Sequence, residues 1–340
     1  MRKPVIAITM GDPAGIGPEI IVRAWADPRT HAICAPVVVG HPAVMERAAR
    51  LVGFAGEVRS VDSPTAASSS VELITCVTAA GDESAEVAHG AVDPRGGQAA
   101  YDCLIAAARL ALAERVDAIT TAPLSKAALH AAGHHYPGHT ELLAELCEVD
   151  DFAMMLYLAQ GDTVRGAAGS GVAHVTLHMG LRQVMAHLSS DAVLAKIMLA
   201  HRVMSALKEG PPRVGVMALN PHGGESGLFG DEEMAIIAPA VERAAAQGVD
   251  ASGPYPADTL MVRARDGEFD GVVAMYHDQG HIALKLLGMH RAVNITLGLP
   301  IVRTSVAHGT AFDIAGLGRA QHSSMIEALR VAAILSKAKR

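Results

Sequence analysis

The chain has 340 residues, half of them hydrophobic, which is enough for two domains with cores of their own. A formal net charge of −7 and the lack of a long Lys/Arg run exclude nucleic-acid binding as the main function. No apolar run reaches transmembrane length, and the N-terminus resembles a strand more than a signal peptide. The four scattered cysteines indicate reduced thiols, so we expect a cytoplasmic protein that binds no membrane.

Short runs rich in β-branched residues alternate with longer amphipathic stretches. We predict strands at Val5–Met10, Val37–Gly40, Ala118–Thr121, Phe152–Leu158, Val172–Leu177, Val214–Ala218, Val272–Met275 and Val293–Leu297. We predict helices at Ala99–Arg115, Asp191–Lys208, Glu232–Gln247 and Ser323–Ala338, and surface loops at Asp62–Ser70 and Gln160–Gly171. This alternation predicts an α/β fold with helices on both faces of parallel or mixed sheets, in two lobes that meet at a cleft.

A glycine-rich turn follows the first strand. In this turn Gly15 and Gly17 allow close approach to the backbone, and Pro18 suits the first turn of a helix. A strand, a glycine turn and a helix N-terminus together favour anion binding. The spacing matches neither the dinucleotide fingerprint nor the P-loop, so an ordinary tight turn is an equal alternative.

Two segments after the third predicted strand carry hydroxyl, ammonium and imidazole groups. Thr120–Lys126 places a lysine at a helix start, and Pro137–Glu141 presents His139 and Thr140 beside a glycine. Each segment alone is also compatible with a capping turn or an exposed histidine.

Three histidines each lie just beyond a predicted strand, namely His178, His222 and His277. Neutral imidazoles are good zinc ligands, and strand ends of an open sheet meet at one edge, so we predict one divalent-metal site. Asp278 is either a fourth ligand or a group that orients His277. His281 is four residues after His277 and could share a helical face with it, but the HExxH zinc motif is absent.

Lys285, Asn294 and Arg303 form a cationic and amide group that suits a phosphate or carboxylate, with surface charge as the alternative. The segment Thr304–Ala311 adds hydroxyls and His308 at a strand-to-helix turn, which is compatible with the polar groups of a nucleotide.

Together these residues resemble the 4-hydroxythreonine-4-phosphate dehydrogenase (PdxA) family, one of whose branches serves pyridoxal phosphate biosynthesis. The matching blocks span nearly the whole chain in the expected order: Met10–Glu19, Thr121–Lys126, Gly138–Glu141, Leu219–His222, Pro256–Thr259, Met275–Gly280, Asn294–Pro300, Arg303–Ser305 and His308–Ala311.

The resemblance implies a two-lobed subunit similar to isocitrate and isopropylmalate dehydrogenases, with 1–125 plus 297–340 as the first lobe and 126–296 as the second. It implies NAD or NADP in the cleft, a divalent metal (zinc first, then magnesium, cobalt or manganese), and a homodimer in which each metal site takes a ligand from the partner. The implied metal ligands are His178, His222 and His277. The implied substrate contacts are His139, Thr140, Asp258, Lys285, Asn294 and Arg303, and the expected cofactor contacts are Gly11, Asp12, Gly15, Gly17, Thr304, His308 and Thr310.

The sequence departs from the family pattern in three places. The segment 161–171 is longer than usual, His178 lies in Leu-His-Met-Gly-Leu-Arg rather than Thr-His-x-x-Leu-Arg, and Ala307 replaces a common Asp. The last two put the substrate and some cofactor contacts in question. His281 resembles the branch that acts on four-carbon sugar-acid phosphates more than the vitamin B6 branch.

The function expected from this reasoning is a metal-assisted, NAD-dependent oxidation of a phosphorylated 3-hydroxy acid followed by decarboxylation, such as 4-phosphooxy-L-threonine or a four-carbon sugar-acid 4-phosphate. Lys126 or Asp278 would serve as the base. One alternative is a dehydrogenase for cis-dihydrodiols of aromatic dicarboxylates, in which the cationic group takes a carboxylate. Less favoured alternatives are a phosphate acyltransferase and a non-catalytic anion-binding protein with structural zinc.

Overall fold

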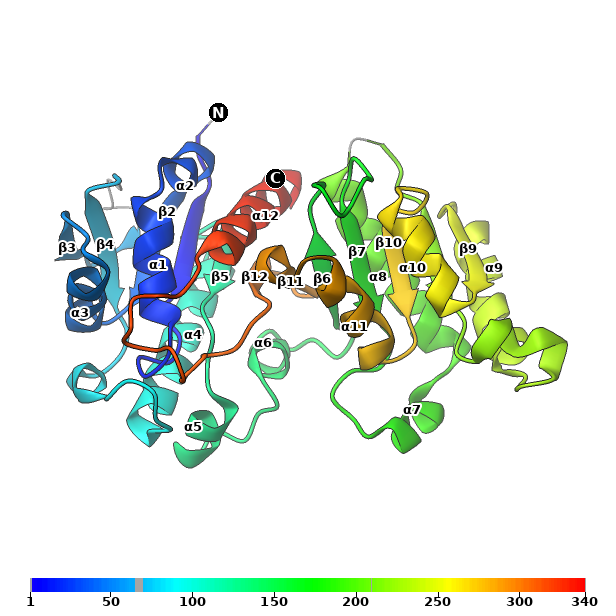
Figure 1. The fold of residues 1–340 in the computed structure, drawn as a ribbon, viewed down its shortest axis with the longest axis horizontal. Coiled ribbons are helices and arrows are strands. Elements are labelled where there is room, and N and C mark those ends of the chain that lie inside the picture. Colours follow the sequence, from blue (N-terminus) through cyan, green and yellow to red (C-terminus); the bar gives the residue numbers. More distant parts are fainter. Residues whose placement is uncertain (1, 65–69, 209, 340) are drawn as a thin grey trace. The chain divides into compact units, whose positions relative to one another are not determined.

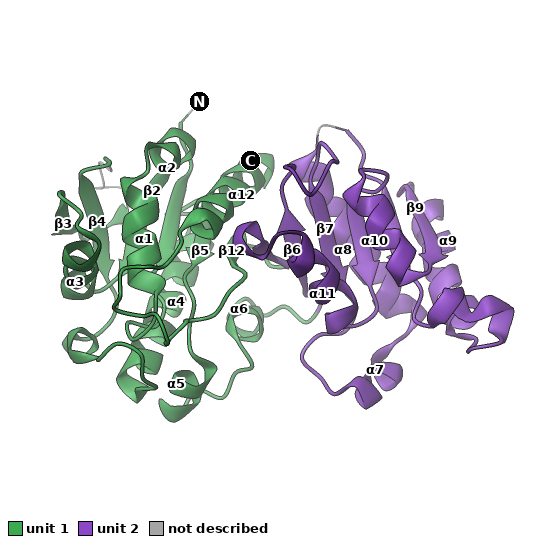
Figure 2. Ribbon diagram, in the orientation of Figure 1, with its two compact units in different colours: residues 1–150, 299–340 green, residues 151–298 purple. Residues whose placement is uncertain are grey.

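The computed structural model describes residues 2–64, 70–208 and 210–339, and the chain divides into two compact units. Unit 1 consists of residues 1–150 and 299–340, and unit 2 consists of residues 151–298 (Figure 2). Each unit is built on its own run of strands flanked by helices (Figure 1). The α/β class expected from the alternating pattern is therefore confirmed.

The strands of unit 1 are all parallel. Their order is β3 (Glu57–Ser60), β4 (Leu73–Thr78), β2 (Ala35–Gly40), β1 (Val5–Thr9), β5 (Ala118–Thr121) and β12 (Arg303–Val306). Consecutive residues of β1 are buried, including both Ile6 and Ala7, so both faces of the sheet are covered. The helices are α1 (Gly17–Ala26), α2 (Pro28–Ile33), α3 (Pro42–Val52), α4 (Pro94–Leu112), α5 (Lys126–Ala131), α6 (His139–Leu146) and α12 (Ser323–Lys339), with a short 3₁₀ turn, η2 (Asp82–Glu86).

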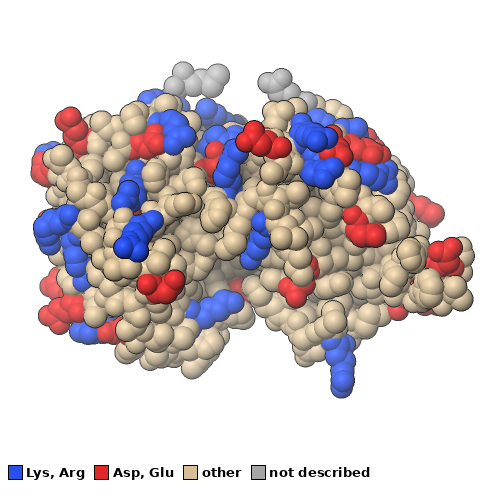
Figure 3. All heavy atoms as spheres, viewed as in Figure 1, with Lys and Arg blue, Asp and Glu red and all other residues tan. Residues whose placement is uncertain are grey.

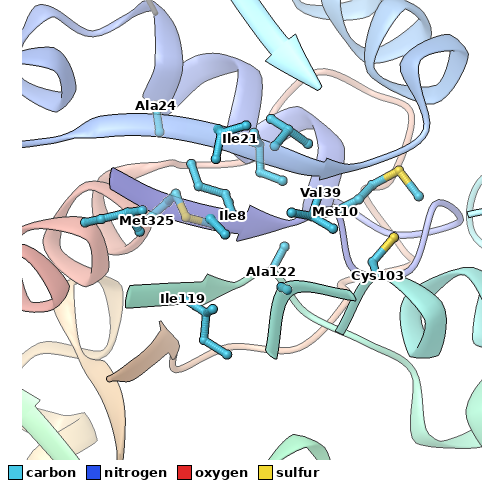
Figure 4. Packing of buried hydrophobic residues seen from close by; sticks show 14 of the residues in the cluster. Ile8, Met10, Ile21, Ala24, Val39, Cys103, Ile119, Ala122 and Met325 are labelled. Carbon is cyan, nitrogen blue, oxygen red and sulfur yellow. The ribbon is translucent and has the colours of Figure 1, made fainter. Parts of the chain in front are cut away.

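The core of unit 1 is made almost entirely of aliphatic and sulfur-containing side chains, as the low aromatic content requires. Figure 4 shows Ile8 of β1 and Met10, just after it, packed with Ile21 of α1, Cys103 of α4 and Met325 of α12. All four cysteines of the chain are free.

The strands of unit 2 form a mixed arrangement. Their order is β11 (Val293–Leu297), β6 (Ala153–Leu158), β7 (Ser170–His174), β10 (Gly271–Ala274), β8 (Val214–Met217) and β9 (Ala251–Tyr255). The β11–β6 and β6–β7 pairs are antiparallel, whereas β7, β10, β8 and β9 are parallel to one another. The flanking elements are α7 (Leu181–His187), α8 (Ser190–Leu207), η3 (Pro221–Gly227), the π-helix η4 (Glu233–Ile237), α9 (Ala238–Ala246), α10 (Ala257–Arg265), α11 (His277–Gly288) and η5 (Met289–Arg291).

All eight predicted strands are present, with ends that shift by up to three residues. Four further strands were not predicted, and three of them have an atypical composition. The edge strand β3 is largely exposed, β9 contains Gly and Pro at the opposite edge, and β12 is polar yet fully buried. The strand β4 was also missed, although its sequence, Leu-Ile-Thr-Cys-Val-Thr, has an ordinary β-propensity.

The predicted helix Glu232–Gln247 is a π-helical turn followed by α9. Pro239 has no N–H to donate to the preceding turn, which accounts for the wider turn before it. The predicted loop 160–171 ends two residues early, because Ser170 and Gly171 already belong to β7. Residues 65–69 of the predicted loop 62–70 lie outside the described residues.

The observed unit boundary near residue 150 differs from the predicted boundary at residue 125. Residues 126–150 belong to unit 1 because α5 and α6 pack against α4. A Cβ on Gly97 of α4 would lie 2.0 Å from the carbonyl oxygen of Ala128, so only glycine permits this close approach of α4 and α5. The second boundary, between Gly298 and Leu299, lies two residues after the predicted one.

Candidate active-site residues

The glycine turn after β1 contacts the segment that follows β12. The amide of Ile16 donates to the carbonyl oxygen of Thr310 (3.0 Å), and a Cβ on Gly15 would lie only 2.9 Å from Thr310 Cβ. Pro18 lies in the first turn of α1, as predicted. Three of the predicted cofactor contacts, Gly15, Gly17 and Thr310, are thus gathered around the N-terminus of one helix in unit 1.

Asp12 is a buried carboxyl in this turn. Its Oδ1 accepts a hydrogen bond from the amide of Ala14 (2.9 Å), whereas its Oδ2 is buried without a hydrogen-bond partner. Burial raises the pKa of Asp12 to about 6, and the nearby charge of Asp93 acts in the same direction. A carboxyl of this kind is destabilising when ionised, which favours a binding role over a purely structural one.

The structure gives Thr304 and His308 different surroundings. Thr304 is fully buried, and its hydroxyl is hydrogen-bonded to Thr120 Oγ1 (2.9 Å) and donates to the carbonyl oxygen of Ala328 in α12 (2.9 Å). Its side chain is therefore a core group, in contrast to the predicted cofactor contact. His308 is half-buried, with Nε2 3.1 Å from Ser324 Oγ.

A cationic group gathers at the end of β5. The guanidinium of Arg303 is 1% exposed and donates to Thr121 Oγ1 (2.7 Å), and burial lowers its pKa to about 10. Burial, and then the charges of Arg303 and Lys126, hold the pKa of His139 well below its usual value. Unit 1 therefore presents a neutral imidazole that two cationic side chains influence, which is suited to an oxyanion such as phosphate.

The helices that carry these groups begin where the sequence indicates. Ser125 caps α5 by accepting a hydrogen bond from the amide of Ala128 (3.2 Å), so Lys126 is the first residue of that helix. His139 and the buried Thr140 form the first turn of α6 after Gly138. Two predicted substrate residues and one predicted catalytic residue are thus at helix N-termini, which favour anions.

Two of the three predicted metal ligands are adjacent in unit 2. The rings of His178 and His277 have centroids 5.8 Å apart, and His277 Nδ1 lies 2.6 Å from Asp278 Oδ1. Because a carboxylate only accepts, this contact places the proton of the neutral imidazole on Nδ1 and leaves the Nε2 lone pair available. His178, His277 and Asp278 line a cavity of about 560 Å³, together with Tyr276 and residues of the segment 177–184.

Two further histidines complete this cluster and were not predicted as site residues. His174 is fully buried in β7, with Nδ1 3.1 Å from the carbonyl oxygen of Met154, so its Nε2 is the acceptor. His281 Nδ1 lies 3.1 Å from His174 Nε2 and 3.2 Å from the carbonyl oxygen of His277. The His281 ring stacks on His277, with centroids 3.7 Å apart and 13° between the planes.

Burial lowers the pKa of His174 to about 4 and that of His281 to about 2, the latter also through the charges of His174, His277 and Lys285. Both imidazoles are therefore neutral. The sequence contained a signal for His281, because this residue lies one helical turn after His277. His174 resembles an ordinary core histidine, and its hydrogen bond to Met154 is consistent with that.

His222 is presented differently from the other predicted ligands. It lies in η3, five residues after β8, with φ 53° and ψ 24°, and its ring packs at 6.3 Å from that of Phe229. Glu225 and Ser226 of the same turn also have positive φ, and each such non-glycine residue costs about 1–3 kcal/mol. Within the described ranges, no three His, Cys, Asp or Glu side chains gather closely enough to hold a metal.

The donors on the described residues nevertheless fit a divalent cation in part. His178 and His277 are neighbouring imidazoles beside a cavity, and Asp278 orients one of them, as in carboxylate–histidine–metal arrangements. A third ligand would have to come from elsewhere, because His222 lies outside this cluster.

The remaining predicted substrate residues are dispersed over unit 2. Asp258 is exposed in the first turn of α10, where its Oδ1 accepts from the amide of Thr259 (2.9 Å). Asn294 lies on β11, donates to Met154 Sδ (3.1 Å), and has a buried Oδ1 without a hydrogen-bond partner. Lys285 lies two turns after His277 on α11.

The sequence has no long run of Lys and Arg, and the distribution of charged side chains on the surface is consistent with this. Acidic and basic side chains are interspersed over the face in Figure 3. No helix within the described part of the chain combines the length and apolar character needed to cross a bilayer.

Comparisons with known proteins identify relatives over the whole chain. Residues 32–332 match the family model described as pyridoxal phosphate biosynthetic protein PdxA. The chain is 46% identical to 4-hydroxythreonine-4-phosphate dehydrogenase of Trichlorobacter lovleyi, over 98% of each chain. It is equally identical, at 46%, to D-threonate 4-phosphate dehydrogenase of Pectobacterium atrosepticum, over 96% of this chain and 98% of the relative.

Solved structures give the same result for the fold. The crystal structure of 4-hydroxythreonine-4-phosphate dehydrogenase from Klebsiella pneumoniae has a TM-score of 0.83 and 43% identity, covering 98% of this chain and all of the other. A terephthalate 1,2-cis-dihydrodiol dehydrogenase from Burkholderia xenovorans has a TM-score of 0.66 and 32% identity over 98% of each chain. With matches of this extent and identity, the chain belongs to the PdxA family.

Proposed function

We propose that this chain is an NAD-dependent dehydrogenase that oxidises the secondary alcohol of a phosphorylated 3-hydroxy acid and releases carbon dioxide from the product. The observation that supports this most directly is the adjacent pair of His178 and His277 beside a cavity, with His277 oriented by Asp278. The named relatives act on 4-hydroxythreonine 4-phosphate or D-threonate 4-phosphate, and both compounds have a hydroxyl β to a carboxylate. Cytoplasmic metabolism is the setting that fits four free thiols.

The proposed metal ligands are His178, His222 and His277, with zinc first and magnesium, cobalt or manganese as alternatives. A divalent cation bound there lowers the pKa of the substrate alcohol and supports loss of carbon dioxide from the keto acid. Asp278 keeps His277 in the tautomer that can ligate, and the His281 ring stacks on the His277 ring. Because Asp278 is engaged with His277, Lys126 is the residue we favour as the base.

We propose that the phosphate binds to the group in unit 1 formed by His139, Thr140 and Arg303. Lys285 and Asn294 of unit 2 are proposed as further substrate contacts. The buried guanidinium of Arg303, already held by Thr121, supplies directional N–H donors. NAD or NADP is proposed to bind at the glycine turn, through Gly11, Asp12, Gly15, Gly17, His308 and Thr310.

The third ligand, His222, is proposed to come from a second copy of the chain. His178 and His277 are adjacent, whereas His222 lies outside their cluster in the same unit. The helix that carries His277 also exposes Ile282 (59%) and Leu286 (82%), one turn apart, which supports a homodimer. Asp258, which is exposed on α10, would reach the partner's substrate in the same way.

A second candidate function is the oxidation of a cis-dihydrodiol of an aromatic dicarboxylate, which the 32% identity to the terephthalate dihydrodiol dehydrogenase favours. In that case Arg303 and its neighbours would bind a carboxylate. The identity to the phosphate-specific relatives is higher, at 46%, so the phosphorylated substrates are preferred.

A substrate panel tests the reaction. The purified enzyme is assayed with NAD and NADP, with each of the four divalent ions, against 4-phosphooxy-L-threonine, D-threonate 4-phosphate, unphosphorylated D-threonate and the terephthalate cis-dihydrodiol. Reduced nicotinamide and released carbon dioxide should appear together with a phosphorylated acid. Its kcat/KM should exceed that of the unphosphorylated acid by on the order of 100-fold or more, because the buried cations would then lack their partner. Turnover of the dihydrodiol alone would establish the second candidate, and unchanged activity after chelation would exclude the metal.

Mixing two inactive variants tests the shared metal site. His222→Ala and His277→Ala should each be inactive. If His222 serves the partner's site, a heterodimer of the two contains one intact site, so random mixing should restore roughly a quarter of wild-type activity. The measurement is activity after co-refolding of differently tagged chains, with heterodimers isolated by both tags. Isolated heterodimers without activity would mean that each site takes all its ligands from one chain.

The raised pKa of Asp12 predicts a pH-dependent cost of stability. Between about pH 4 and pH 6 the folded chain keeps the Asp12 proton, whereas the unfolded chain has released it. The free energy of unfolding therefore falls as pH rises through this range, and the loss is complete above about pH 6. Asp12→Asn remains neutral and can still accept from Ala14, so at pH 7.5 it should be more stable than wild type by about 1–3 kcal/mol. At pH 4.5, where the unfolded chain has already released most of the Asp12 proton, the difference should fall to about a third of its value at pH 7.5.

Urea unfolding at both pH values measures this difference, and NAD titration of the same variant should show weaker binding. A stability difference that is the same at pH 4.5 and pH 7.5 would contradict an ionised, buried Asp12.

A further inference from the structure

We propose that Glu233 is a positioning residue that holds the left-handed turn η3 and thereby presents His222 to a metal. This inference rests on the proposed function, which makes His222 a metal ligand. The residue lies on the π-helical turn η4, eleven positions after His222, and it is 3% exposed.

The turn that carries His222 has backbone hydrogen bonds of its own, such as that from the amide of Gly223 to the carbonyl oxygen of Asn220 (3.2 Å), but its dihedral angles are strained. His222, Gly223, Gly224, Glu225 and Ser226 follow one another with φ between 45° and 77°. Three of these residues have side chains, and such side chains disfavour the left-handed region. A run of strained residues persists only where contacts with surrounding residues hold its conformation.

Glu233 fixes the backbone conformation where the turn begins. Its Oε1 accepts from the amides of Leu219 (2.8 Å) and Asn220 (2.7 Å), and its Oε2 accepts from Asn220 Nδ2 (3.0 Å). Burial alone would raise the pKa of Glu233, but the hydrogen bonds from Asn220 and Leu219 bring it below the usual value. An ionised carboxylate is thus fixed beneath the two residues that precede Pro221.

The middle of the turn is packed on the same carboxylate. A Cβ on Gly224 would lie 2.6 Å from Glu233 Oε2 and 3.0 Å from the carbonyl oxygen of Gly230. Glycine at this position therefore lets the turn close over Glu233. The carboxylate contacts both the start and the middle of the segment, so it defines the direction in which His222 leaves the end of β8.

The neighbouring Glu232 does not have this role. It accepts only from Asn220 Nδ2 (2.6 Å) and is half-buried. An isosteric amide at 233 would keep the volume but replace an acceptor by an N–H group that faces other donors. The loss should therefore affect the turn, and through it the ligand, more than the fold of unit 2.

The experiment compares Glu233→Gln with Glu242→Gln, which makes the same charge change at an exposed site of α9. Zn²⁺ affinity of the full chain is measured by competition with a chromophoric chelator, and amide exchange of the peptide spanning 219–227 is measured on the metal-free protein. E233Q should weaken Zn²⁺ binding about 10–100-fold and speed this exchange about tenfold or more, whereas E242Q should match wild type in both.

Ser226→Gly provides a rescue, because glycine adopts positive φ without strain. The double variant E233Q/S226G should regain part of the lost Zn²⁺ affinity, and S226G alone should bind as wild type does. If E233Q shows no cooperative melting, Asn220→Ala replaces it, since this change removes one contact to Glu233 and keeps the backbone ones; a several-fold loss of affinity is then expected.

Wild-type Zn²⁺ affinity in E233Q, or in N220A where E233Q does not fold, would overturn the proposal. A wild-type protein whose Zn²⁺ binding is absent, or is unaffected by H222A, would overturn the proposed metal site and with it this role of Glu233. Slower turnover with unchanged Zn²⁺ affinity would also overturn it, because the turn would then act on something other than the ligand.

Discussion

The hydrogen bond between His277 Nδ1 and Asp278 Oδ1 determines what the histidine cluster of unit 2 can do. With the proton on Nδ1, the Nε2 lone pair of His277 is available as a ligand. The same reasoning extends through the cluster, because His281 donates from Nδ1 to the carbonyl oxygen of His277 and to His174 Nε2. In their neutral forms His277, His281 and His174 each have the tautomer fixed by a neighbour, with the proton on Nδ1 and Nε2 unprotonated.

The sheet explains why these residues meet. The strands β7 and β10 are parallel neighbours, with Ala274 opposite His174, so the segments that follow them leave the same edge. His178 and His277 lie on those two segments. This much was predictable from the sequence, because a histidine after each of two apolar strands needs only parallel pairing to bring the rings together.

The same argument also predicted that His222 would join this cluster, and in the structure it does not. The strand β8 also neighbours β10, so a histidine shortly after β8 was expected at that edge. The left-handed turn η3 redirects the chain, and its shape depends on Glu233, which is distant from the motif and has no local signal. Hydrophobic periodicity and motif spacing do not predict contacts between residues this far apart in the sequence.

Other differences have similar causes. Thr304 belongs to a motif suited to a nucleotide, yet its hydroxyl is satisfied in the core by Thr120 and Ala328. The segment 126–150 joined unit 1 because Gly97 admits α5 against α4, a contact invisible in composition. By contrast, the glycine turn and the helix start at Lys126 followed from local residue chemistry and are present.

The most direct test of this account is the crystal structure of the zinc-loaded enzyme, with anomalous scattering collected at the zinc edge. The account predicts one peak about 2.0–2.1 Å from Nε2 of both His178 and His277, with Nδ1 of His277 still bonded to Asp278. Zinc bound through Nδ1 of His277, or a peak that contacts neither histidine, would contradict it.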